Sequence, residues 1–202
     1  MKKLFKASSL KGINDWMLDE GLLENDPERK ALRQPLEEFT TNIAAGYRSL
    51  VEKDKKFTLP DAQVKKLKNP EKASDLWSEH VVLQGIMGIT PDIMTEMFEH
   101  ACDLDHEKRH GEAINVLWYL IYLNPYVGWF WHQLGRCWEV INENEHAIYA
   151  YSVAINCEPF AADLYRDAVR CLLNSREVDR ALALLEFSIQ RIKIDSGNHQ
   201  KL

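Results

Sequence analysis

The chain has 202 residues, of which 46% are hydrophobic and 28% are charged, a composition typical of a globular protein with one or two domains. The formal net charge of −6 argues against a dedicated nucleic-acid-binding protein. The four cysteines form no C-x-x-C pair and are too few for a disulfide scaffold. We therefore expect a protein of a reducing compartment, the cytoplasm.

No stretch of the sequence predicts membrane insertion. The first residues, Met1 to Lys6, are basic, but no apolar segment of the kind found in secretory signals follows them. The longest unbroken apolar run, Val116 to Leu123, has eight residues, whereas a transmembrane helix needs about 20. We expect no stable membrane insertion and no secretory leader.

The first part of the chain is expected to be helical. Asp26-Pro27 resembles an N-cap followed by proline at the first helical position. A regular apolar spacing then predicts an amphipathic helix that starts near Pro35. The residues of this stripe are Leu36, Phe39, Ile43, Tyr47 and Leu50. The lysine-rich residues 53–72 indicate a solvated linker or a site for an anionic surface, and Ser74 is expected to open another helix.

The second part of the chain contains an internal repeat. Pro125 and Pro159 are 34 residues apart, and Ala113, Ala147 and Ala181 follow one another at the same interval. A period of 34 residues is the signature of tetratricopeptide (TPR) helical hairpins. The predicted repeats are residues 94–127, 128–161 and 162–195.

The middle repeat follows the TPR pattern most fully. Trp131-x-x-Leu134-Gly135-x-x-Trp138 matches W-x₂-L-G-x₂-Y with one aromatic exchanged for another. Gly135 is expected to let two helices approach closely, and Ala154 is expected at a helix crossing where a larger side chain would not fit. The sequence thus predicts an all-α fold of three tandem TPR hairpins in a short superhelix. A helical N-terminal extension precedes them, with domains at residues 1–73 and 74–202.

Residues 74–192 together resemble the SycD/LcrH type of chaperone of bacterial type III secretion systems. The matching stretches are Gly88-Ile89-Thr90-Pro91-Asp92-Ile93, the segment from Trp131 to Cys137, and the segment from Ala168 to Leu173. The glycine run common in this family before the first repeat is absent, and His80-Val81-Val82 stands there. The resemblance implies a cytoplasmic bacterial chaperone without a cofactor, which holds translocator proteins before export and forms a weak homodimer through the helix before the repeats.

The pentapeptide His106-Glu107-Lys108-Arg109-His110 spells the zinc-protease motif H-E-x-x-H. The repeat register places it at the end of one helix and in the turn before Gly111, so the two histidines would not share a helical face. No third histidine ligand follows, since Ala113 stands where that extended motif has glycine. We therefore expect no metal site and no catalytic activity. Cys137 and Cys171 are expected to be small core residues.

Candidate binding residues follow from the TPR register, in which four positions of the first helix of each repeat point into a concave groove. These positions are Thr95, Phe98, Cys102 and Asp105, then Trp129, His132, Arg136 and Glu139, then Asp163, Arg166, Arg170 and Leu173. From them we predict a peptide-binding site. Its residues are Phe98, Cys102, Trp129, His132, Arg136, Arg166 and Arg170.

Two alternatives stay open within this set. Trp129 is either a core residue or an apolar anchor for a bound peptide. The three arginines either contact a client or pair with local acidic residues such as Asp163 and Asp167. The expected function is capture of an extended client segment in the groove; the alternative is a generic TPR scaffold, or a chaperone for a needle subunit.

Overall fold

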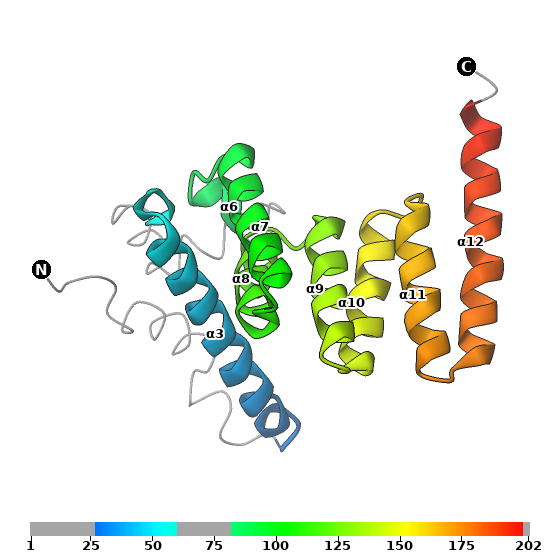
Figure 1. Cartoon of the computed structure of the whole chain (residues 1–202), viewed down its shortest axis with the longest axis horizontal. Helices are drawn as coiled ribbons and strands as arrows, with labels where there is room; N and C mark the ends of the chain where they lie inside the picture. Colours follow the sequence, from blue (N-terminus) through cyan, green and yellow to red (C-terminus); the bar gives the residue numbers. More distant parts are fainter. Residues whose placement is uncertain (1–26, 60–81, 200–202) are drawn as a thin grey trace, which may run out of the picture.

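The computed structural model describes residues 27–59 and 82–199 of the chain, and every regular element in these ranges is helical. Figure 1 shows the helices in an extended row, from α3 at one end to α12 at the other. No helix in these ranges is both long and apolar enough to cross a membrane. The part of the lysine-rich segment from Pro60 onward and the helix expected to open at Ser74 lie outside the described residues.

Helix α3 (Pro27–Lys53) begins at the proline that the sequence marks as a first helical position. The expectation that Pro35 starts the helix is wrong, because α3 continues through it. Ile43, Tyr47 and Leu50 of the predicted stripe are buried. A short 3-10 helix, η1 (Lys55–Phe57), follows.

The partner of α3 is α8 (His110–Leu123), not a neighbour in the sequence. The two backbones come so close at Gly46 that an added Cβ atom would lie 2.0 Å from the carbonyl oxygen of Asn115. Only glycine allows such an approach. Tyr47 and Tyr119 pack ring to ring in the same interface, with centroids 5.4 Å apart. Ile43, Tyr47 and Leu50 of the stripe are therefore covered within the chain.

Six helices follow the short helix α6 (Leu83–Ile86), and each packs against the next. Thr90 caps the first of them by accepting a hydrogen bond from the Ile93 backbone N–H. Their bounds are α7 (Pro91–His106), α8, α9 (Gly128–Val140), α10 (Asn144–Cys157), α11 (Ala162–Asn174) and α12 (Val178–His199). Since α9 and α11, and likewise α10 and α12, begin 34 residues apart, the helices follow the predicted period.

The same turn recurs with this period. Lys108, Asn142 and Arg176 have φ angles of 64°, 64° and 63°, in the left-handed region. In each turn the next residue donates a backbone hydrogen bond back into the preceding helix, as Glu143 does to Trp138. This is the Schellman ending of a helix. It repeats at the carbonyls of Leu104 and Leu172.

The α9–α10 pair shows why the repeat residues are small. A Cβ atom added to Gly135 would lie 2.7 Å from the ring of Tyr151, so the glycine admits that ring between the two helices. Ala147 and Ala154 are fully buried. Cys137 and Cys171 are also fully buried, which confirms that they are core residues.

Candidate functional site

The predicted groove positions lie on α7, α9 and α11, the first helix of each pair, and we call this surface the helix-A face. Trp129, Arg136, Arg166 and Arg170 are exposed, Phe98 and Cys102 are half-buried, and His132 is buried. The remaining five positions, Thr95, Asp105, Glu139, Asp163 and Leu173, also keep solvent contact.

Two aromatic residues stand on this face at α7 and α9. Phe98 packs against Phe130, with ring centroids 5.4 Å apart, and this contact joins α7 to α9. Trp129 is 45% exposed. The Trp129 and His132 rings meet edge to face, with their centroids 5.6 Å apart. A large apolar side chain thus rests against His132 while much of it faces solvent.

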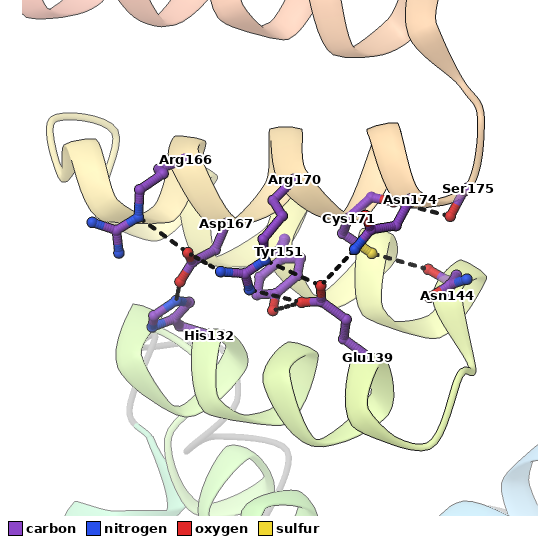
Figure 2. Close-up of polar contacts among 10 residues, drawn as sticks. All are labelled: His132, Glu139, Asn144, Tyr151, Arg166, Asp167, Arg170, Cys171, Asn174 and Ser175. Carbon is purple, nitrogen blue, oxygen red and sulfur yellow. Dashed lines mark hydrogen bonds and ion pairs between the residues drawn. The ribbon is translucent and has the colours of Figure 1, made fainter.

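Asp167 of α11 holds the His132 side chain in place. The His132 Nε2 atom donates a hydrogen bond of 2.8 Å to Asp167 Oδ2, and both side chains are buried. Arg166 and Arg170 also donate to Asp167, at 3.2 and 3.1 Å (Figure 2). Burial opposes ionisation of Asp167, but the bonds from His132 and Arg166 and the charge of Arg170 outweigh it and hold the pKa below its usual value.

A second carboxylate, Glu139 of α9, is bound in the same way. Arg170 donates to both of its oxygens, at 3.0 and 3.2 Å, in the two-pronged geometry that guanidinium groups favour. The Tyr151 hydroxyl donates at 2.8 Å, and Asn174 at 3.4 Å. Burial, followed by this bond to Glu139, raises the pKa of Tyr151. Figure 2 shows how these side chains from α9, α10 and α11 converge.

The three predicted arginines therefore differ. Arg166 pairs with Asp163 and Asp167, and Arg170 pairs with Asp167 and Glu139. The local acidic partners that the sequence suggested are therefore present for these two. Arg136 is exposed and has no hydrogen-bond or ion-pair partner among the residues that the structure describes. Its cationic head is the one member of the predicted trio left uncompensated within the described ranges.

Half-buried Asp105 joins α7 to α8 and α9. Its Oδ1 atom lies 2.7 Å from His110 Nδ1, and its Oδ2 atom accepts a hydrogen bond of 2.8 Å from Gln133 Nε2. The Cys137 thiol donates a weaker bond to Oδ1. Burial, reinforced by the charge of Asp105, raises the pKa of Cys102. The same two causes raise the pKa of Cys137. Neither thiol has the lowered pKa that marks a reactive cysteine.

The H-E-x-x-H pentapeptide lies in a turn, as its register predicts. His106 is the last residue of α7 and His110 is the first of α8. Glu107 binds Arg109, and His110 binds Asp105. Across residues 27–59 and 82–199, no three side chains of the metal-binding types come together.

The sequence did not reveal the hydrogen bonds that hold Glu139 of the helix-A face in place. Tyr151 belongs to α10, and no local pattern pairs its hydroxyl with Glu139 twelve residues earlier. Asn174 reaches the same carboxylate from 35 residues away. The repeat register itself carried a usable signal, since it places α9 and α11 side by side and so predicts contacts between their facing residues.

No protein-family model matches this chain. No curated protein matches it either.

Solved structures do match. A chain of the CopN–Scc3 complex aligns with a TM-score of 0.53 and 20% identity, over 74% of this chain and 88% of that one. The type III secretion translocator chaperone SycD from Yersinia enterocolitica aligns with a TM-score of 0.52 and 22% identity, over 55% and 83%.

A type III secretion complex from Aeromonas hydrophila aligns with a TM-score of 0.51 and 17% identity, over 65% of this chain and 99% of that one. Identities this low carry information about architecture alone. The all-helical TPR-like architecture predicted from the 34-residue period is confirmed: the chain has the fold of type III secretion chaperones such as SycD.

Proposed function

We propose that this chain is a non-enzymatic chaperone of bacterial type III secretion, which acts in the cytoplasm. It binds an extended segment of a secreted, translocator-type protein on the helix-A face and so masks an apolar client segment before export. The fold shared with SycD supports a role in type III secretion. The exposed Trp129 supports the helix-A face as the place where the client binds.

Trp129 is the proposed apolar anchor. Tryptophan is among the residues that contribute most to protein–peptide affinity. His132 lies against its ring, and Asp167 holds His132 in turn, so the indole needs little ordering when a client arrives. His132 therefore serves the site by positioning Trp129. Phe98 and Cys102 extend the apolar surface along α7.

Arg136 is the proposed polar contact. It lies two helical turns after Trp129 on α9 and has no partner in the described part of the chain. A client carboxylate or backbone carbonyl next to an apolar side chain would satisfy both residues. Arg166 and Arg170 hold α9 and α11 together, and we assign them a supporting role.

The test is the binding of tiled peptides from the translocator proteins of the same bacterium, measured as association and dissociation rates. Trp129→Ala should cost about 2–4 kcal/mol of affinity, mainly through faster dissociation. Tyr149→Ala is the matched control, because Tyr149 is also an exposed aromatic but lies on α10, outside the helix-A face. Arg136→Glu should mainly slow association, and added salt should weaken wild-type binding.

Two results would contradict the proposal. If Trp129→Ala stays folded by circular dichroism and binds as tightly as the wild type, the client does not use this face. If no translocator peptide binds but a folded secretion component does, the chain is a scaffold between folded proteins.

A further inference from the structure

The last helix of the row carries an exposed apolar stripe. Val178, Leu182, Leu185 and Ile189 of α12 are each between 44% and 54% exposed, and we call them the α12 stripe. Single exposed apolar residues are ordinary, but a continuous line of four on one helix marks a contact surface.

Helix α12 faces α11 with a different side. Ala181 and Ser188 are buried against the rest of the chain, and Leu184 is half-buried between them. Leu182, Leu185 and Ile189 of the stripe each directly follow one of these three residues, so the stripe lies beside the face that packs on the chain. Figure 1 shows α12 at the end of the row, with its C-terminal end extending past α11. Each of the four stripe residues keeps close to half of its surface in solvent.

The spacing of the stripe is that of a coiled-coil seam. Its residues follow one another at steps of four, three and four, and Ile192 occupies the next position of the register. Two helices with this repeat bury their seams against each other. A seam on the outermost helix can be completed only from outside the packed row.

We propose that a second copy of this chain covers the α12 stripe, with the two α12 helices antiparallel about a two-fold axis. A two-fold contact brings the same patch of both copies together, so a self-complementary apolar seam fits it. Leu185 of one copy then lies opposite Ile189 of the other.

The charges that flank the seam favour this arrangement. The flanking positions on one side hold Asp179, Glu186 and Lys193. The antiparallel register places the Asp179 position of each copy beside the Lys193 position of the other, which gives two opposite-charge pairs. A parallel pair would instead set Glu186 beside Ala181 and Lys193 beside Ser188, with no opposite charges to pair.

The same register brings the two Glu186 residues together at the two-fold axis. This like-charge contact weakens the dimer and keeps it in the range of transient association. It also gives the proposal a prediction that an unrelated occupant of the stripe does not share. Glu186→Gln should tighten self-association about fivefold.

The experiment is sedimentation velocity on the full chain from 1 to 300 µM, a range chosen to span weak association (~10⁻⁶–10⁻⁴ M). The wild type should shift from monomer to dimer across this range. The double variant with Leu182→Glu and Leu185→Glu should stay monomeric at every concentration in this range. Ala183→Glu is the matched control, because Ala183 is exposed on the same helix but lies outside the seam, and it should dimerise like the wild type.

A charge exchange tests the orientation. Lys193→Asp should weaken the dimer at least fivefold, and adding Asp179→Lys in the same chain should restore it. A wild type that is monomeric at every concentration would overturn the proposal. So would a dimer that survives the two leucine changes, since it would use another surface, or a charge exchange without recovery.

Discussion

The two ends of the helix row are built differently. At the α3 end, α8 is enclosed by α3, α7 and α9 and buries eight side chains, nearly all of them apolar. At the other end, α11 is tied to α9 by carboxylate–arginine bonds, and α12 leaves its apolar stripe in solvent. The comparison teaches that the α3 end is closed by apolar packing, while the α12 end leaves apolar surface in solvent.

The strongest way to break this comparison is at Gly46. In Gly46→Ala the new Cβ atom would lie 2.0 Å from one backbone atom of Asn115 and 2.5 Å from another, and a backbone cannot yield as a side chain can. We expect a loss of about 3 kcal/mol or more in the free energy of unfolding, read by thermal and urea denaturation. Gly85→Ala is the control, because its added Cβ atom would meet no other element of the described residues within 4 Å. Equal stability of the two variants would show that α3 does not dock on α8.

Gly135→Ala probes the middle of the row. The new methyl group meets the Tyr151 ring at 2.7 Å, and the bond to Glu139 restrains the ring from moving aside. We expect a loss of about 2–3 kcal/mol, measured by the same denaturation curves. Tyr151→Leu in the alanine background should recover part of this loss; no recovery would mean that the methyl group clashes elsewhere.

Asp167→Asn sharpens the polar side of the comparison. Removing the charge leaves Arg170 and His132 with a weaker acceptor, and we expect a loss of about 1–2 kcal/mol at pH 7. The folded-state pKa of Asp167 lies below its ordinary value of 3.8, so this stabilisation is present above pH 4 and disappears as the pH falls through the folded pKa. Wild type and variant should therefore converge in acid.

The measurement for Asp167→Asn is the midpoint of urea denaturation from pH 7 to pH 2. Asp163→Asn is the control, because Asp163 also binds Arg166 but is exposed, and surface ion pairs contribute little. A difference that stayed constant down to pH 2 would contradict the assigned ionisation.

The smallest effect is expected on α12. Leu182→Ala should change the unfolding free energy by less than about 0.5 kcal/mol in dilute solution, because the side chain is more than half exposed. Leu117→Ala, in the enclosed helix α8, should cost about 2–5 kcal/mol. Similar losses from the two changes would abolish the distinction between the ends of the row.

How well the sequence predicts a contact depends on how far apart the two residues lie in the chain. The 34-residue period placed Gly135, the buried cysteines and the H-E-x-x-H turn correctly, because all of these follow from local register. It did not predict the contact of Gly46 with Asn115, since no pattern within α3 specifies which helix it meets. Proline was a misleading signal at Pro35, where the helix continues.

The helix-A face was predictable in part for the same reason. Apart from His132, which is buried, the register selected positions that keep solvent contact, and it named both interpretations of the arginines. It could not show that Arg166 and Arg170 are bound by carboxylates of their own and neighbouring helices while Arg136 has no such partner in the described ranges. That difference depends on side-chain reach across α9 and α11, which periodicity does not encode.

The docking of α3 on α8 has a consequence for synthesis of the chain on the ribosome. The other helices pack against sequence neighbours and can pair soon after they emerge, but Gly46 waits for Asn115, about 70 residues later in the chain. Until then the face of α3 that packs on α8 lacks this partner. Translation pauses within that interval should therefore increase aggregation of the nascent protein more than pauses placed after α8.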